Sequence, residues 1–181
     1  MALTADNVIV ALTGAAMVAD VGATAPTDAS TAWGSGWTDL GFISEDGIDY
    51  DANRESKEIK AFQNGAVVRK MNSGEAPTWK LTLLETTAAG LGLYFAGATI
   101  TGAAPGTGSI DYKGANANKK AFGLDIVDGD RLIRWVIPLG EVSDIGTLAM
   151  KNGEPYSYEL TITGYPGPGG TRFKKFWTTA A

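Results

Sequence analysis

The pattern of apolar and polar residues over positions 37–97 predicts, in chain order, a strand, an acidic turn, a long hairpin, a strand and a short helix. Residues 58–62 and 67–70 are strand-prone and flank Asn64-Gly65. An Asn-Gly pair between two such runs is a strong hairpin signal, because both turn residues must adopt positive φ. The segment therefore predicts a long β-hairpin.

A strand with one buried face is expected next. Trp79, Leu81 and Leu83 alternate with Lys80 and Thr82. Side chains on a strand point to opposite faces in turn, so the three apolar residues share one face. That face is expected to lie in the core.

A short amphipathic helix is expected after residue 85, where the apolar spacing changes to three and four. Its stripe comprises Ala88, Leu91, Tyr94 and Phe95. Thr86 is the predicted N-cap. Gly90 and Gly92 weaken the helix by roughly 1 kcal/mol each, so it is expected to depend on packing against a sheet.

Alternation returns in the second half of the chain. Apolar residues occupy every second position over 122–126, before a predicted turn at 128–129, and again over 156–162. Residues 131–139 are apolar on both faces, which predicts a central strand, and Pro138 is expected to mark an edge or exit.

The remaining segments are interpreted as strands, loops and arms around one domain that spans residues 1–181. A strand is expected at 8–12 and another within the Gly- and Ala-rich stretch 97–118, at 109–113. Residues 19–36 are the predicted N-terminal arm or loop, and residues 165–181 are the predicted C-terminal arm. The fold class is therefore mainly β, a β-sandwich or partial barrel with one short flanking helix, extended terminal arms and a long hairpin loop.

Composition removes most catalytic chemistry. The 181 residues include no Cys and no His, and the formal net charge is −5. The chain thus has no thiolate, no usual neutral-pH base and no Ser-His or Cys-His pair. A net negative charge also disfavours tight binding to nucleic-acid phosphates. We expect no catalytic residue, metal ion or cofactor, and no enzyme activity.

The N-terminal apolar run does not resemble a targeting segment. No positive residue precedes it, whereas Asp6 does. It is also far shorter than the roughly 20 residues that span a bilayer. We expect synthesis in a cytoplasm and no membrane anchor.

The acidic residues near position 50 have two chemical interpretations. Asp49, Asp51 and Asn53 have the spacing of half an EF-hand loop, but Arg54 and Lys60 occupy the positions that need Gly and Glu. A glycosidase-like carboxylate pair could be drawn from residues 45, 46, 49 and 51. A solvated surface is the favoured interpretation of both.

Aromatic and basic residues near the termini suggest contacts. Trp33, Trp37 and Trp177 are interpreted as anchors into a neighbour or as a cover for the domain's own core, with a sugar-stacking platform as the alternative. The basic cluster Arg172, Lys174 and Lys175, interleaved with aromatics, favours a protein contact over single-stranded nucleic acid.

The ordered set of segments resembles the major tail (tail tube) proteins of long, non-contractile-tailed bacteriophages. The segments, in chain order, are GATAPTD, WTDLGFISEDG, EIKAFQNGAVVR, WKLTLLET with LGLYFAG, DIVDGDRLIRWVIPLGEVSDIG and YSYELTITGYP. The resemblance covers nearly the whole chain. It implies a β-sandwich subunit that forms stacked hexameric rings in the virion tail, with a lumen that conducts double-stranded DNA without specific binding. Implied partners are further copies of the chain and the tape-measure, tail terminator and tail-tip proteins.

Residue roles follow as expectations from this resemblance and from strand alternation. The candidate lumen-facing acids are Asp39, Glu55, Glu58, Asp125 and Asp144. A loop over residues 64–77 is the candidate ring-stacking element, with Asn64, Gly65, Met71, Asn72 and Glu75. The candidate arm contacts are Trp33, Trp37, Phe173 and Trp177. A carbohydrate- or surface-binding module of a virion is the alternative function, and an acid-dependent hydrolase that uses Glu45 with Asp46 or Asp49 is the third.

Overall fold

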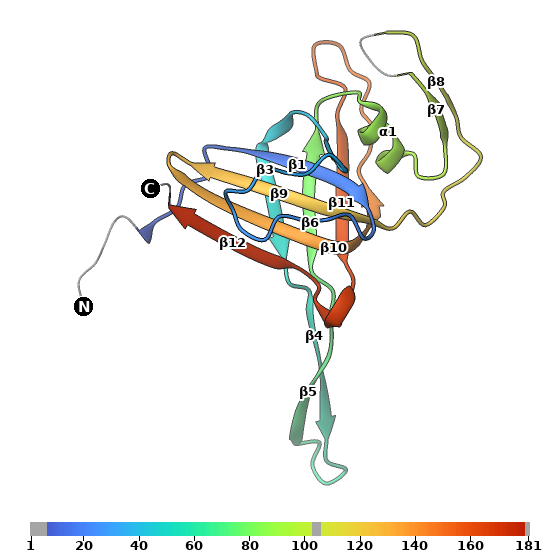
Figure 1. The fold of residues 1–181 in the computed structure, drawn as a ribbon. Helices are drawn as coiled ribbons and strands as arrows, with labels where there is room; N and C mark the ends of the chain where they lie inside the picture. Colours follow the sequence, from blue (N-terminus) through green and yellow to red (C-terminus); the bar gives the residue numbers. More distant parts are fainter. Residues whose placement is uncertain (1–6, 103–105, 180–181) are drawn as a thin grey trace.

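The computed structural model describes residues 7–102 and 106–179. Strands β1, β9, β10 and β12 run across β3, β6 and β11, and a narrow hairpin projects from one end (Figure 1). The elements are β1 (Thr13–Asp20), β2 (Trp37–Asp39), β3 (Ile43–Asp51), β4 (Arg54–Lys60), β5 (Val67–Glu75), β6 (Thr78–Leu83), α1 (Ala88–Tyr94), β7 (Thr99–Thr101), β8 (Ser109–Asp111), β9 (Lys120–Asp128), β10 (Arg131–Ile145), β11 (Tyr158–Gly164), a 3-10 turn (Pro168–Gly170) and β12 (Lys174–Thr179).

The prediction of a mainly β fold with one short α-helix is confirmed. The main sheet has the order β2-β1-β9-β10-β11-β6-β3, and β12 also pairs with β10. Its two ends, β2 and β3, do not pair with each other in the described part of the chain, so the sheet is a partial barrel. The parts of the predicted domain at residues 1–6 and 103–105, and the end of the predicted C-terminal arm at 180–181, lie outside the described residues.

Strand β10 is the predicted central strand, and it carries the chain from one layer to the other. One of its sides pairs with β12 as far as Val136 and then with β11 from Gly140. The register with β9 shifts between Ile137 and Gly140. Pro138, expected at an edge or exit, lies at this change of partner, where the missing N–H of proline interrupts no regular ladder.

The core fills the space between the crossing layers. The alternating residues Trp79, Leu81 and Leu83 are buried, as predicted, and so are Leu160 and Ile162. Burial of such side chains stabilises the fold by roughly 1.5–3 kcal/mol each. The alternation therefore locates the core correctly in β6 and β11.

Strand β9 departs from the one-sided burial that its alternation predicts. Phe122 and Leu124 face the core, but Gly123 and Asp125 are buried as well. The second face is covered by the segment 23–36, whose Trp33 ring lies over Gly123: a Cβ at this glycine would be 2.2 Å from the indole. Sequence alternation could not show this cover, because it comes from a distant loop.

The helix lies on the sheet, as its glycines require, but its N-cap is one residue later than predicted. Thr87 Oγ1 accepts the Gly90 N–H at 3.0 Å. The Thr86 hydroxyl instead lies 3.2 Å from the Tyr158 hydroxyl. The buried helical residues include Leu91, and they pack on the core beside β11.

The strand predicted at residues 8–12 is wrong, because regular pairing begins at Thr13. Val8, Val10 and Leu12 are all more than half exposed. Only the Leu12 N–H extends the ladder, to the Val127 carbonyl at 3.0 Å. The run passes the end of β9, so no second layer covers its side chains.

The hairpin around Asn64-Gly65 is confirmed, with both residues at positive φ, 69° and 68°. The expected loop over residues 64–77 is wrong: residues 67–75 form β5, paired with β4, and the connection is limited to residues 61–66. β3 continues into β4, and β5 into β6, after breaks of two residues. The hairpin is thus the distal half of one long ribbon, of which only the β3–β6 half has a second layer.

Candidate assembly surfaces

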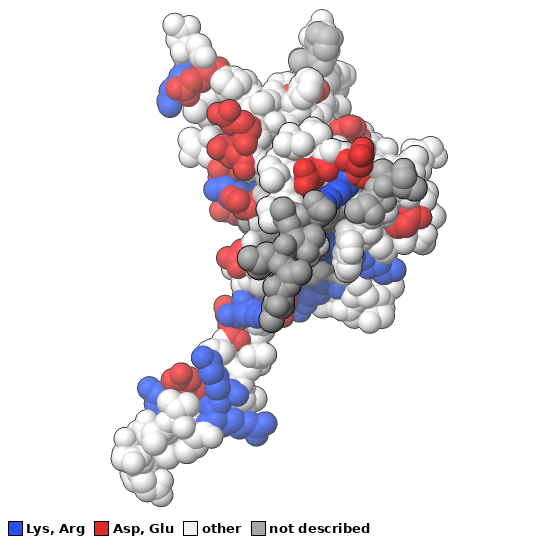
Figure 2. Space-filling view, turned by 90° about the vertical axis from the view of Figure 1, so that its left-hand side faces the viewer, with Lys and Arg blue, Asp and Glu red and all other residues white. Residues whose placement is uncertain are grey.

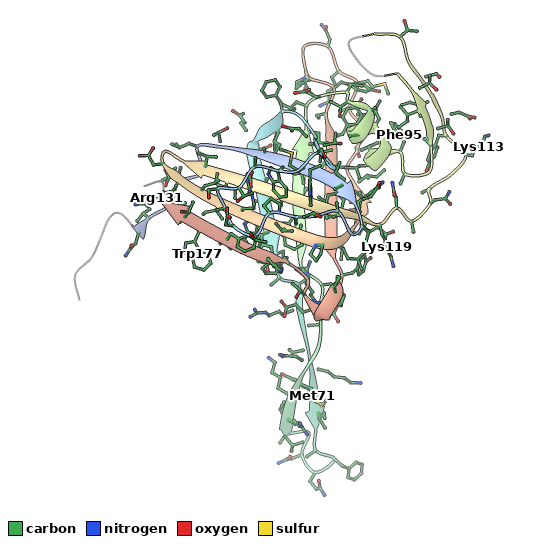
Figure 3. The ribbon with its side chains drawn as sticks, in the orientation of Figure 1. Met71, Phe95, Lys113, Lys119, Arg131 and Trp177 are labelled. Carbon is green, nitrogen blue, oxygen red and sulfur yellow. The ribbon has the colours of Figure 1, made fainter. Side chains whose placement is uncertain are left out.

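The projecting hairpin exposes apolar side chains that nothing in the protomer covers. Every residue of β4 is exposed. The exposed apolar residues of the hairpin are Ile59, Phe62, Val67, Val68 and Met71. Figure 3 shows the side chains of this ribbon, Met71 among them, projecting without a layer against them. An isolated two-stranded hairpin is marginal in water, and exposed apolar side chains gathered on a projecting hairpin favour an interaction site.

The same hairpin is basic in an acidic chain. Positions 54–75 hold five Lys or Arg residues and three Glu residues, a formal charge of +2 against −5 for the whole chain. Figure 2 shows the basic side chains on the hairpin and most acidic ones on the body. The basic residues are Arg54, Lys57, Lys60, Arg69 and Lys70. We call the apolar and basic side chains together the hairpin surface.

The predicted stacking residues fall on different parts of this hairpin. Asn64 and Gly65 form its tip, and Met71 and Asn72 lie midway along β5. Glu75 lies at the base, where its carboxylate is 3.6 Å from Arg54 Nε. The five predicted stacking residues therefore extend from the tip to the base of the hairpin and are not clustered in a loop.

A second surface is the outward face of β3, β6, β11 and the end of β10, which we call the polar face. Asp49, Lys80, Thr161 and Asp144 stand in cross-strand register on these four strands. Directly opposed residues in antiparallel strands share a face. Lys80 Nζ is 3.1 Å from Glu159 Oε2. Among these named residues, the three carboxylates of Asp49, Asp144 and Glu159 outnumber the one ammonium group of Lys80.

The structure separates the five acids predicted to face a lumen. Asp144 lies on the polar face, and Asp39 is exposed at the end of β2. Glu55 and Glu58 lie on the hairpin, where Glu58 is opposite Lys70. The prediction for Asp125 is wrong, because this residue is only 8% exposed and its carboxylate is held inside the protomer.

Asp125 and Arg134 form a buried ion pair that fixes the N-terminal arm. Arg134 Nε and Nη2 donate to the two carboxylate oxygens at 2.7 and 2.8 Å. Trp33 Nε1 donates to Asp125 Oδ2 at 2.7 Å, and the Arg134 guanidinium lies 4.4 Å from the Trp33 ring centroid. Arg134 Nη1 also donates to the carbonyls of Asp28 and Thr31. We call this arrangement the arm latch.

The arm is further ordered by its own turn. The Asp28 carboxylate accepts hydrogen bonds from the hydroxyl and the backbone N–H of Thr31 and of Ser30. These bonds, led by those from Thr31, lower the pKa of Asp28 from 3.8 to about 2. The turn presents the two carbonyls that Arg134 binds.

Trp33 and Trp37 therefore cover the domain's own core, which was one of the two interpretations of these residues. Trp37 is buried at the start of β2, and its Nε1 donates to the Thr24 carbonyl at 2.9 Å. The prediction that they contact a neighbour from a free arm is wrong for this protomer. The latch itself has one signal in the sequence, because Asp125 and Arg134 are the charged residues within the apolar runs 121–127 and 132–137.

The two aromatic residues predicted as contacts of the C-terminal arm differ in their surroundings. Phe173 packs against Trp79 and Trp135, with ring centroids 5.5 and 5.0 Å apart. Trp177, on β12, remains 74% exposed and points away from the sheet (Figure 3). Of the predicted arm contacts, Trp177 is the one with a free aromatic surface.

The predicted basic cluster is not one patch. Arg172 Nη1 donates to the Gly164 carbonyl at 3.2 Å, and Lys175 Nζ lies 4.6 Å from the centroid of the Trp135 ring. Two of the three cations thus contact their own domain, whereas Lys174 is exposed. A continuous groove for single-stranded nucleic acid does not follow from this arrangement.

The residues of the proposed EF-hand loop do not form a metal site in the described part of the chain. The residues with EF-hand spacing lie on β3, β4 and the break between them, which is not a loop between helices. Within residues 7–102 and 106–179, no three His, Cys, Asp or Glu side chains are grouped as metal ligands. In the same residues, no helix has the length and hydrophobicity needed to cross a membrane.

Comparisons with known proteins place these surfaces in context. A solved structure described as the tube-terminating cap of the anti-feeding prophage is similar to the chain, with 15% identity, a TM-score of 0.45, and coverage of 99% of this chain and 100% of that one. No curated protein matches. The family model for phage tail tube proteins matches residues 1–177. A match over nearly the whole length shows that the chain belongs to the phage tail tube protein family.

Proposed function

We propose that the chain is the repeating subunit of a phage tail tube, that it forms stacked hexameric rings, and that their lumen conducts DNA during ejection. The hairpin surface is the observation that carries this proposal. It is long, lacks a second layer and exposes Phe62 fully. A free edge and an apolar ribbon are hazards in a monomer, but they become bonding surface between identical subunits.

The polar face is the proposed lumen wall. Asp49, Asp144 and Glu159 give it an excess of negative charge, and Thr161 adds a neutral polar group. Like charge disfavours phosphate contacts and the counterion release that drives DNA binding. DNA would therefore slide past this wall without adhering.

The proposed role is structural and belongs to the virion tail. Further copies of the chain are the main partners. The tape-measure, terminator and tail-tip proteins complete the tube at its ends and set its length. Trp177 on β12 is the proposed aromatic contact of the C-terminal arm with another tail component. Asp39, Glu55 and Glu58 are not assigned to this wall, because Asp39 lies at the end of β2 and the two glutamates lie on the hairpin.

Tube formation tests the proposal through two hairpin residues. The double variant Phe62→Ser/Val68→Ser should keep its fold, because exposed substitutions change stability within about 0.5 kcal/mol. It should form no tubes in negative-stain micrographs or in sedimentation at concentrations where the natural chain does. Met150→Ser, on a body residue that is 75% exposed, is the matched control. Normal tubes from the double variant would contradict the role of the hairpin.

The lumen assignment is tested separately by charge reversal. Tubes of Asp49→Lys/Asp144→Lys should retain short duplex DNA at low salt and release it as salt rises, because each new cation can neutralise a phosphate. Natural tubes should retain none. Lys113→Glu, on an exposed residue beside β8, is a control for charge change elsewhere. Equal DNA retention by natural and charge-reversed tubes would exclude the polar face as the wall.

A further inference from the structure

A groove lies between the start of β1 and the beginning of β3, and we call it the β1–β3 groove. β2 pairs with β1 only at residues 17–19. The register of β3 with β6 shifts between Ile43 and Ile48, so residues 44–47 leave the ladder. The space between the two strands is lined by residues of both, by Glu85, and by Asp125 and Ile126 of β9.

The walls of the groove combine exposed apolar side chains with carboxylates. Leu12 is 67% exposed and Phe42 is 74% exposed. Asp39, Glu45 and Glu85 also line the groove, and no Lys or Arg does so among the described residues. Charge and hydrophobicity are therefore concentrated at one place on the body.

Two of these carboxylates are fixed in position by the backbone of the loop after β2. Glu85 Oε1 accepts the Phe42 N–H at 2.9 Å, and Asp39 Oδ1 accepts the Gly41 N–H at 2.9 Å. Gly41 has φ of 86°, and a Cβ there would be 2.5 Å from the Glu85 carboxyl carbon. Asp39 and Glu85 are thus held in fixed positions at the rim of the groove by backbone amides of this loop.

The hairpin surface has the complementary character. Its tip exposes Phe62 and Val68, and the basic residues Lys60 and Arg69 lie just behind the tip. Opposite charges around matched apolar patches favour one docking orientation and disfavour others.

The groove and the hairpin lie at opposite ends of the same strand ribbon. β3 begins at the groove with Ile43 and runs directly into β4 at Arg54 (Figure 1). A contact between the hairpin of one copy and the groove of the next is heterologous, so each subunit keeps one free hairpin and one free groove. Heterologous contacts form closed rings or open filaments, depending on the rotation between copies, and the growth of stacked rings needs the open, head-to-tail form.

We propose that the β1–β3 groove receives the hairpin tip of a second copy of the chain. Phe62 and Val68 cover Phe42 and Leu12, while Lys60 and Arg69 approach the acidic rim. This inference rests on the proposed function, because it names the receiving site for the hairpin in tube growth. Nucleic acid is disfavoured as the occupant, because its phosphates would meet three carboxylates.

Disulfide trapping tests the contact, because the natural chain has no cysteine. Full-length Phe62→Cys and Phe42→Cys variants are mixed, assembled and oxidised. A disulfide-linked dimer should form in the mixture at least about tenfold more than in either variant alone. Met150→Cys mixed with Phe62→Cys is the control and should give only background. Tubes that form without the expected crosslink overturn this inference and leave the proposed function standing.

Charge exchange gives a second test that does not depend on a bond. Lys60→Glu and Glu45→Lys should each raise the concentration needed for tube growth by about tenfold or more, because like charges then face each other. The double variant should return to within about threefold of the natural chain, because the opposite pair is restored. A double variant no better than the worse single one overturns the groove. A natural chain that forms no rings or tubes, even with tail partners, overturns the proposed function and the inference together.

Discussion

Replacement of Arg134 by Met is the most informative test of the arm latch. Arg134 is 3% exposed and Asp125 is 8% exposed, and the guanidinium binds both carboxylate oxygens. In Arg134→Met, the Trp33 indole is the one side-chain donor to that carboxylate that remains among residues 7–102 and 106–179. Breaking a buried pair by removing one partner costs about 3–5 kcal/mol, because an uncompensated charge stays buried.

Proton uptake sets a ceiling on this cost. A carboxylate with the ordinary aspartate value near 3.9 can be neutralised at pH 7 for about 4 kcal/mol, and at pH 5 for about 1.5 kcal/mol. The loss of stability in Arg134→Met should therefore be about 3–4 kcal/mol at pH 7 and less than half of that at pH 5. For a domain of this size, the pH 7 loss corresponds to a fall in Tm of roughly 6–16 °C.

Urea unfolding followed by tryptophan fluorescence and circular dichroism measures the effect at both pH values. Arg134→Met/Asp125→Asn should be more stable than Arg134→Met by about 2 kcal/mol at pH 7, because the buried charge is gone and the neutral amide oxygen still accepts from Trp33. A loss below about 1 kcal/mol that is the same at pH 5 and pH 7 would refute the account of the latch as a buried, charge-dependent contact.

Three further predictions concern the arms. Gly123→Ala should destabilise the fold by about 1–3 kcal/mol, because the new Cβ displaces the Trp33 ring. A red shift of the indole fluorescence reports this displacement. Gly74→Ala is the control, because the space around Gly74 is open. The pKa of Asp28 is about 2, below its ordinary 3.8, so the contribution of the Asp28 carboxylate to stability is complete above about pH 4 and is lost as the pH falls to 2. The difference in Tm between the natural chain and Asp28→Asn should therefore shrink as the pH falls from 4 to 2. A difference in Tm that does not change with pH would contradict this role of Asp28. Trp177→Ser should leave Tm unchanged, because the side chain is 74% exposed, while weakening assembly; a large fall in Tm would show that Trp177 is part of the core.

Local pattern was sufficient for most strands. The period-2 alternation in β6 and β11 placed Trp79, Leu81 and Leu160 in the core. The positive φ of Asn64 and Gly65 follows from their residue types. The same rule failed at residues 8–12, because apolar alternation shows a potential to pair and not whether a partner and a covering layer are present.

The assembly surfaces needed knowledge of register and of long-range packing. From strand alternation alone, Asp125 is predicted to be a surface acid. In the structure it is covered by Trp33, which lies 92 residues away in the sequence. The polar face depends on which residue of β6 stands opposite which residue of β3 and β11, and that register is set by the turns and bulges between them.

Local sequence pattern predicted the hairpin and the strands β4–β6 and β8–β11, composition removed histidine and cysteine chemistry, and the match over residues 1–177 confirms the family resemblance. The tertiary structure decided which charges are buried, that the hairpin has no second layer, and that a groove lies at the other end of its ribbon. The physical reason is that side-chain period is a property of neighbouring residues. Burial, charge pairing and exposed edges depend instead on contacts between segments far apart along the chain.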